Sequence, residues 1–450
     1  MIALLLVIVF VMGYTFIVLE HPLKMDKTIP TLLMAALMWA ILSLGFNSGM
    51  AEIIDSHDHL LKIVQGEIAH EGFVSTLVHH LGKTSEILFF LLGAMTIVEL
   101  IDLHSGFEVL KGYIKTRNKT RLLWMVGIIA FFLSAIIDNL TTTIVLVTLL
   151  RKLIPNKKER LWYAGLIVIA ANAGGAWSPI GDVTTTMLWI GNKTSALNLI
   201  IEILLPSLVN FGVPFMIASL LPVFKGTISI EEEENNKKMK SSKTMLFLGL
   251  GMIIFVPFFK TITHLPPYLG MMFSLSIVWL VSEFIHPEEN FNPKDRHLFS
   301  GLRALSRIEM SSILFFLGIL LAVASLETVA VENIGGLKYM AVQLQNAIPN
   351  QEIVVSILGV LSAVIDNVPL VAATMGMYDY PIDDPIWHLI AYAAGTGGSM
   401  LIIGSAAGVA AMGMEKIDFI WYFKKITILA VVGYVLGILT FIVWSSIFLH

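Results

Sequence analysis

Long apolar segments alternate with short polar ones along most of the chain. Many of them approach the roughly 20 residues that an α-helix needs to cross a membrane, so the pattern predicts an all-α polytopic membrane protein with about ten spanning helices. The predicted spans are 1–19, 29–47, 85–103, 161–192, 198–222, 244–260, 267–285, 308–326, 386–411 and 420–447.

Two further apolar segments, 122–150 and 353–378, are interrupted near their middle by polar residues. Asp138 interrupts the first segment and Asp366 the second, and each is followed by an asparagine. A charged side chain at bilayer depth is costly and usually serves a function. We therefore expect both segments to be re-entrant hairpins, each of which enters and leaves the membrane on one side.

Composition and charge agree with this topology. Charged residues make up 14% of the 450 residues and hydrophobic residues 56%, whereas soluble domains carry about 25% charged residues. With both hairpins in place, every arginine and most lysines fall on one side of the membrane, which the positive-inside rule makes cytoplasmic. Both termini are then predicted outside, and the first segment, which lacks a basic start, is predicted to be a retained helix. The absence of cysteine excludes disulfides and thiolate chemistry, and no basic patch suggests a nucleic-acid partner.

The two halves of the chain repeat each other. Residues 134–139 (Ser-Ala-Ile-Ile-Asp-Asn) return as residues 362–367 (Ser-Ala-Val-Ile-Asp-Asn), and further matches before and after this segment keep the same order. Because the two hairpins are predicted to open on opposite sides, the repeats are inverted, as in many secondary transporters. The predicted domains are a first repeat at 1–222, a cytoplasmic linker at 223–243 and a second repeat at 244–450.

Spans 161–192 and 386–411 are predicted to be discontinuous helices. The first contains Asn-Ala-Gly-Gly-Ala-Trp-Ser-Pro-Ile-Gly-Asp at 172–182, and glycine and proline interrupt helices. Its counterpart at 395–405 has Gly395 in place of Asn172 and Ser405 in place of Asp182. The repeats are thus chemically unequal, and we expect the first to hold the stronger site.

Carboxylate, amide and hydroxyl oxygens at these interruptions suit a hard cation such as sodium. No lysine or arginine falls within the hairpins or the discontinuous spans, which argues against an anion as cargo. Burial favours a neutral carboxyl group and a bound cation favours a charged one, so sodium and protons can compete for Asp138, Asp182 and Asp366. Glu86, Glu99 and Glu327 are weaker candidates, as proton relays.

At residues 134–143, 172–186, 362–369 and 395–408 the sequence resembles the NhaD-type sodium/proton antiporters of the ion transporter superfamily. The resemblance implies exchange of sodium or lithium for protons across a bacterial inner membrane, without a cofactor. It also implies roles for Asn172, Thr184, Thr185 and Ser362, and it implies a homodimer with an elevator-like transport domain. The residues and the resemblance together give these candidates for ion binding and transport: Asp138, Asn139, Thr141, Thr142, Asn172, Asp182, Thr184, Thr185, Ser362, Asp366, Asn367, Ser399 and Ser405. Those expected to hold sodium are Asp138, Asn139, Asp182, Asp366 and Asn367.

Three other classes of function are alternatives to antiport, of which a scaffold or channel is disfavoured because a channel needs no inverted repeat with broken spans. A dicarboxylate or other anion transporter of the same fold is the strongest alternative, although such relatives carry Ser-Asn-Thr where this chain has aspartate at the hairpin tips. An intramembrane enzyme is disfavoured, because the sequence has neither a His-Glu-x-x-His zinc motif nor a recognisable pairing of nucleophile and base.

Overall fold

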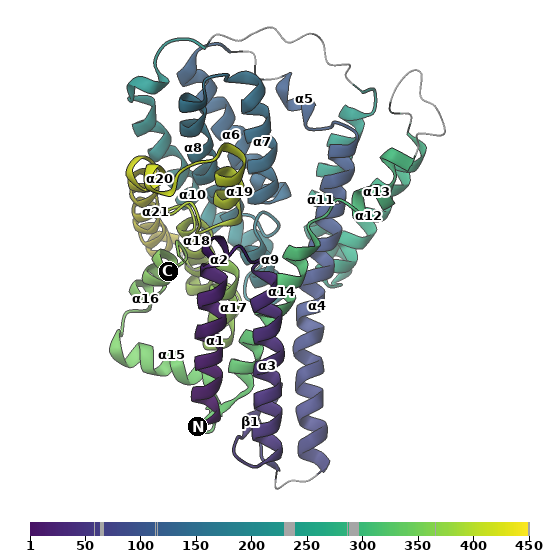
Figure 1. Cartoon of the computed structure of the whole chain (residues 1–450), viewed down its shortest axis with the longest axis vertical. Helices are drawn as coiled ribbons and strands as arrows, with labels where there is room; N and C mark the ends of the chain where they lie inside the picture. The colour runs from purple at the N-terminus through teal and green to yellow at the C-terminus, as the bar shows by residue number, and fades with distance from the viewer. Residues whose placement is uncertain are drawn as a thin grey trace. The chain divides into compact units, whose positions relative to one another are not determined.

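The computed structural model of the chain describes residues 1–57, 59–63, 67–112, 114, 116–228, 239–285, 287, 297–364 and 366–448. Residues 229–238, which form the centre of the predicted linker 223–243, lie outside these ranges. Most described residues are helical, as Figure 1 shows.

The helices are α1 (Ile2–Val18), α2 (Glu20–Leu23), α3 (Thr28–Asn47), α4 (Glu67–Leu103), α5 (Glu108–Lys111), α6 (Lys119–Ile137), α7 (Asn139–Leu153), α8 (Lys157–Ala176), α9 (Val183–Ile190), α10 (Ala196–Ser219), the 3-10 helix η2 (Pro222–Phe224), α11 (Ser242–Thr263), α12 (Pro267–Phe284), α13 (Gly301–Leu305), α14 (Met310–Thr328), α15 (Gly336–Ala347), α16 (Gln351–Leu361), α17 (Asn367–Met377), α18 (Pro385–Gly397), α19 (Ala406–Glu415), α20 (Phe419–Lys425) and α21 (Thr427–Phe448). The strands form two short antiparallel pairs, β1 (Ile53–Ile54) with β2 (Leu60–Leu61) and β3 (Ala330–Val331) with β4 (Ile334–Gly335).

The all-α polytopic fold is confirmed. Among the described residues, seven helices are long and apolar enough to cross a membrane, namely α3, α6, α10, α11, α12, α14 and α21. The four interruptions expected from the sequence separate α6 from α7, α8 from α9, α16 from α17 and α18 from α19. Each break coincides with the Asp-Asn or glycine-rich motif that predicted it.

Three details differ from the sequence-based expectation. The outer segment before the third span was expected to be a loop up to residue 84, but α4 already begins at Glu67. Polar residues such as His70 and His79 interrupt the apolar pattern in this helical extension. The pattern predicts which residues contact lipid or the core, and not whether the backbone is helical. The last span was expected to be continuous over 420–447, yet Ile426 separates α20 from α21. Helix α15 was not predicted at all.

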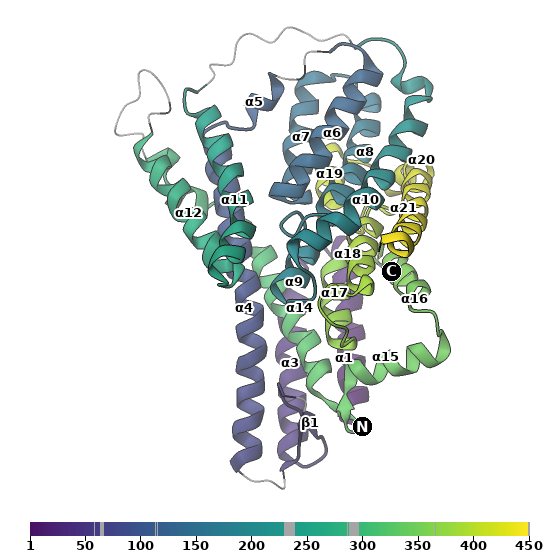
Figure 2. The same cartoon turned by 180° about the vertical axis from the view of Figure 1, so that it is seen from behind.

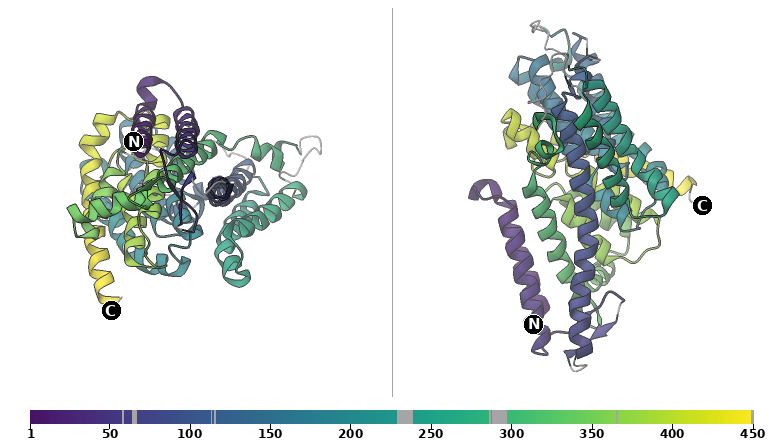
Figure 3. Two further views of the ribbon diagram at one scale, coloured as in Figure 1. Left: turned by 90° about the horizontal axis from the view of Figure 1, so that it is seen from below. Right: turned by 90° about the vertical axis from the view of Figure 1, so that its right-hand side faces the viewer.

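Contacts divide the chain into two compact units. The first comprises Met1–Phe89, Glu309–Val354 and Val368–Pro381, and the second comprises Phe90–Ile308, Val355–Asn367 and Ile382–His450. In the first unit, α1 and α3 lie side by side, as the purple helices of Figure 3 show. Helix α3 also packs against α14, where a Cβ atom on Gly318 would lie 3.0 Å from the carbonyl oxygen of Thr31. The Trp39 indole completes this contact by donating a 2.8 Å hydrogen bond to the carbonyl oxygen of Leu321.

The second unit contains the first hairpin, formed by α6 and α7, and both discontinuous helices. Helices α6, α7 and α8 pack together, and Figures 1 and 2 show them as neighbours from opposite sides. Helices α10 and α21 pack closely because glycine lines their contact: a Cβ atom on Gly433 would lie 2.6 Å from the Asn210 carbonyl oxygen. Small residues at helix contacts of this kind are typical of membrane bundles.

Candidate functional site

Asp138 forms the tip of the first hairpin. It is the single residue between α6 and α7, and its backbone has φ +82° and ψ 160°, a region that residues other than glycine rarely adopt. Its side chain caps α7 by accepting hydrogen bonds from the Thr141 amide at 2.7 Å and the Thr141 hydroxyl at 2.9 Å. The cap holds a half-buried carboxylate at the point where the helix direction reverses.

Asp182 ends the break in the first discontinuous helix. It is the N-cap of α9, and its carboxylate accepts a hydrogen bond of 3.0 Å from the Thr184 amide. The Thr185 hydroxyl donates to the Asp182 carbonyl oxygen at 3.0 Å. Asp182 is 3% exposed, so its second carboxylate oxygen faces protein groups and not bulk solvent.

Two asparagines direct their amide groups at this carboxylate. Asn139, the first residue of α7, donates to Asp182 Oδ2 at 2.9 Å and also to Asn172 Oδ1 at 2.9 Å. Asn367, the first residue of α17, lies 3.3 Å from Asp182 Oδ2. Asn172 in turn donates to the Ser405 hydroxyl at 3.0 Å. The structure thus joins five of the predicted residues, from both repeats, into one buried hydrogen-bonded cluster.

Close backbone approaches make this cluster possible. A Cβ atom on Gly174 would lie 2.1 Å from the Phe131 carbonyl oxygen, and one on Gly181 would lie 2.8 Å from that of Ser134. The Ser134 hydroxyl also donates to the Ala171 carbonyl oxygen at 2.6 Å. Any larger residue at Gly174 or Gly181 would push the broken helix away from the hairpin that carries Asp138 and Asn139.

The second repeat reproduces this packing at matched positions. A Cβ atom on Gly397 would lie 1.9 Å from the Gly359 carbonyl oxygen, and the Ser362 hydroxyl donates to the Ala394 carbonyl oxygen at 2.9 Å. Ser405 caps α19 by accepting from the Gly408 amide at 3.2 Å. The sequence repeat therefore corresponds to a repeated packing arrangement, in which the capping side chain (Asp182 against Ser405) and Asn172, which Gly395 replaces, differ in chemistry.

The remaining candidates lie at or near these elements, with different contacts. Thr142 is fully buried on α7 and its hydroxyl has no hydrogen-bond partner among the residues that the structure describes, which leaves an oxygen available beside the tip. The Ser399 hydroxyl, just beyond the end of α18, instead donates to the Thr396 carbonyl oxygen of that helix at 2.6 Å. Asp366 is half-buried immediately before Asn367. Ser134 was not among the candidates, although its match with Ser362 in the repeated motif could have identified it.

Of the proposed proton relays, only Glu99 belongs to the same unit as this cluster. Glu99 forms an ion pair with Arg307 at 2.9 Å, and Arg307 also pairs with Asp102 at 2.6 Å. Glu86 and Glu327 belong to the first unit, whereas the cluster belongs to the second.

Electrostatically the site is acidic. The charges of Asp138 and Asp366 both interact with that of Asp182, and segments 122–150, 161–192, 353–378 and 386–411 contain no lysine or arginine. Within the described ranges no cluster of three or more His, Cys, Asp or Glu side chains is arranged to hold a metal ion. A transported cation would therefore depend on amide, hydroxyl and main-chain oxygens in addition to carboxylates.

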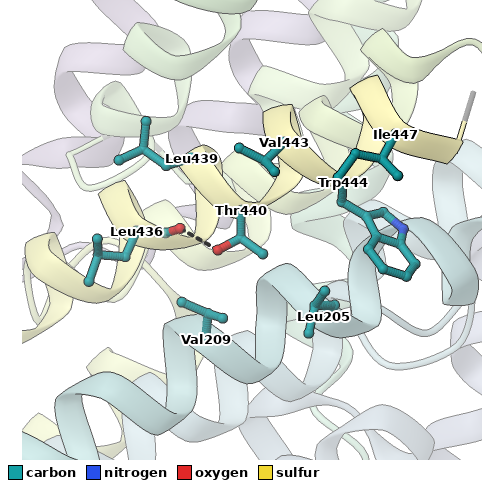
Figure 4. Close-up of a pocket in the computed structure, with 8 residues that line it drawn as sticks. All are labelled: Leu205, Val209, Leu436, Leu439, Thr440, Val443, Trp444 and Ile447. Atoms are coloured by element: carbon teal, nitrogen blue, oxygen red, sulfur yellow. Dashed lines mark hydrogen bonds between the residues drawn. The ribbon is translucent and has the colours of Figure 1, made fainter.

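An apolar pocket of about 370 Å³ lies between α10 and α21, away from these polar groups. Figure 4 shows its lining residues, and the Thr440 hydroxyl there donates to the Leu436 carbonyl oxygen of its own helix at 2.7 Å. The Thr440 hydroxyl is the only oxygen among the lining side chains, and one hydroxyl does not make an ion site, so we assign the pocket no part in ion binding.

Comparison with known proteins places these features in context. The family model described as a citrate transporter matches residues 14–379. Sodium/proton antiporter 1 of Arabidopsis thaliana is 46% identical over 97% of this chain and 71% of its own length. Sodium/proton antiporter 2 of the same plant is 42% identical over 97% of this chain and 98% of its own length. The Na(+)/H(+) antiporter NhaD of Vibrio cholerae is 31% identical over 96% of this chain and 89% of its own length.

Among solved structures, the YdaH transporter of Alcanivorax borkumensis has a similar fold. The TM-score is 0.57, and the match covers 94% of this chain and 98% of the other. Sequence identity is 12%, so this likeness concerns the fold alone.

Proposed function

The chain belongs to the NhaD-type family of sodium/proton antiporters, and on that premise we propose that it exchanges sodium or lithium for protons across a membrane. The observation that carries the proposal is the buried Asp182 carboxylate, which is surrounded by amide groups and by further acidic residues. A carboxylate without a basic partner at membrane depth requires a mobile positive charge to neutralise it.

Two asparagines contact the Asp182 carboxylate. In this arrangement Asn139 and Asn367 direct amide hydrogens at Asp182. A cation would require oxygen atoms instead, so on ion binding these amide groups rotate and present their carbonyl oxygens.

Exchange follows from competition at the carboxyl groups. A proton or a sodium ion neutralises Asp182, whereas a bare anionic cluster is costly to move through the low-dielectric membrane. Asp138 and Asp366 interact with the charge on Asp182, so occupancy at one carboxylate changes the others. Coupling of sodium movement to proton movement therefore requires no structural element beyond these carboxyl groups.

We further propose that the protein resides in a bacterial inner membrane with both termini outside, and that it forms a homodimer. The distribution of arginine and lysine supports the orientation. The bacterial NhaD relatives support the location.

The family model described as a citrate transporter supports a second candidate, sodium-coupled transport of an organic anion. An anionic cargo would need cationic partners, and segments 122–150, 161–192, 353–378 and 386–411 contain no lysine or arginine. Sodium/proton exchange therefore requires negatively charged groups at this site, whereas transport of an organic anion requires positively charged groups.

Inverted membrane vesicles from a strain without its own antiporters provide the test. After a pH gradient is established, collapse of the gradient on addition of NaCl or LiCl, followed with a pH-sensitive dye, is the expected result. KCl serves as the cation control, and radiolabelled citrate uptake tests the alternative. Citrate uptake without any response to an alkali cation would overturn the antiport proposal.

A further inference from the structure

Glu415 is a buried carboxylate at the end of α19, far along the helix from the ion site. Its side chain is 1% exposed, and it accepts hydrogen bonds from Arg151 at 2.7 Å and from Arg160 at 2.8 Å. Arg151 lies in the last turn of α7 and Arg160 in the first turn of α8. These three residues, which we call the Glu415 clasp, join the ends of three helices.

The opposite parts of the same three helices carry the ion site. Asn139 begins α7, Asn172 lies in the last turns of α8, and Ser405 caps the start of α19. The chain of hydrogen bonds from Asn139 to Asn172 and from Asn172 to Ser405 joins the three helices there. The helices are therefore tied together at both ends.

The lengths between the two ties agree. At a rise of 1.5 Å per residue, Asn139 lies about 18 Å from Arg151 along α7, and Asn172 lies about 18 Å from Arg160 along α8. Ser405 lies about 15 Å from Glu415 along α19. Because the three helices are of similar length and are already held together near Asn139, Asn172 and Ser405, the contacts of Glu415 at their opposite ends constrain the spacing of the helices at the ion site.

Burial distinguishes this clasp from an ordinary surface ion pair. Exposed ion pairs contribute little to stability, whereas removal of one member of a buried pair leaves the other charge without compensation. The Glu415 side chain is almost fully buried, and that of Arg160 is 14% exposed. Lys119 and Glu159 form another ion pair at 2.7 Å, which joins α6 to α8 but does not involve α19.

We propose that Glu415 is a positioning residue for the ion site. By holding α7, α8 and α19 together, its carboxylate fixes the relative positions of Asn139, Asn172 and Ser405 at the other end. The effect on transport rests on the proposed function. The effect on the geometry of the three helices does not.

The transport test uses Glu415→Gln, which keeps the shape but removes the charge, with Glu159→Gln as the matched control. Loss of groups that support ion ligands typically weakens affinity by about tenfold or more, so we expect at least that rise in half-saturating sodium for Glu415→Gln alone. Arg151 also donates to the Met414 carbonyl oxygen, but Arg160 contacts α19 through Glu415. The double variant Glu415→Gln/Arg160→Gln should therefore raise half-saturating sodium no further than Glu415→Gln does. If Glu415→Gln lowered the unfolding temperature but left half-saturating sodium unchanged, the Glu415 clasp would contribute to stability alone, and the proposal would be overturned.

A second measurement does not depend on ion exchange. The chain has no cysteine, so Thr143→Cys places a single thiol on α7, at a fully buried position one turn from Asn139. Combined with Glu415→Gln, this thiol should react faster with a small maleimide than it does alone or with Glu159→Gln. Unchanged reactivity would show that the site end of α7 does not move and would overturn the proposal. A wild-type protein that gives no response to sodium would refute antiport, and the labelling result would still decide the role of Glu415.

Discussion

Replacement of Asp182 by asparagine removes the charge at the centre of the cluster and leaves its shape nearly unchanged. Asparagine is as good an N-cap as aspartate, so the Thr184 amide keeps an acceptor and α9 should still begin at Val183. What is lost is the attraction between a carboxylate and a cation. At an effective dielectric constant of about 20, two unit charges about 4 Å apart interact by about 4 kcal/mol, which corresponds to roughly a thousandfold in affinity.

The vesicle assay measures this loss directly as the concentration of NaCl that gives half-maximal collapse of the pH gradient. We expect Asp182→Asn to show no response at attainable sodium concentrations, from neutral to alkaline pH. Asp418→Asn is the matched control, because Asp418 also caps a helix, accepting from the Trp421 amide at 2.9 Å, but is exposed to solvent. If Asp182→Asn retained the wild-type half-saturation, the reasoning that places the cation at this carboxylate would be refuted.

Three further variants test the packing around the site. Gly174→Ala should lower the yield and unfolding temperature of the folded protein, because its Cβ would meet a main-chain oxygen of α6 at 2.1 Å, while Gly212→Ala, with open space around it, should not. Ser134→Ala should lower the free energy of unfolding by about 1 kcal/mol, the usual net contribution of a hydrogen bond, and a loss of both expression and fold would contradict that modest estimate. Asp383 is partly buried, which opposes its ionisation, but hydrogen bonds from the start of α10 outweigh this and hold its pKa below the usual value. Its stabilising contribution is therefore present above the unfolded-state pKa of about 3.9 and is lost as the pH falls through the lower folded-state pKa, so wild type and Asp383→Asn should converge in unfolding temperature at acidic pH and differ at neutral pH.

The sequence was sufficient to predict the four helix breaks at the Asp-Asn and glycine-rich motifs, although not the break at Ile426. Asp138, the Asp366 motif and the glycine pairs are residues whose chemistry is incompatible with an uninterrupted apolar helix, and they signal this without any tertiary information. The internal match between residues 134–139 and 362–367 also showed that the Asp-Asn interruption occurs once in each half of the chain.

The sequence did not reveal which of these residues meet. The hydrogen bonds from Asn139 and Asn367 to the same carboxylate depend on a three-dimensional arrangement that brings both repeats together. The sequence also did not indicate that Glu415 is buried, because a glutamate at the end of an apolar helix usually faces solvent. Its role follows only from its burial and from the two arginines that reach it.

The paired helix caps have a consequence for the divergence of such proteins. Asp182 has φ −145° and ψ 150°, and Ser405 has φ −146° and ψ 154°, so the backbone at the two positions is the same although the side chains differ. Aspartate, asparagine, serine and threonine all cap helices, so each can occupy either position without loss of the helix that follows. A duplicated ancestor could therefore exchange one ligand at a time while it continued to fold, and ion selectivity could drift between descendants through substitutions at a position that structural stability leaves nearly neutral.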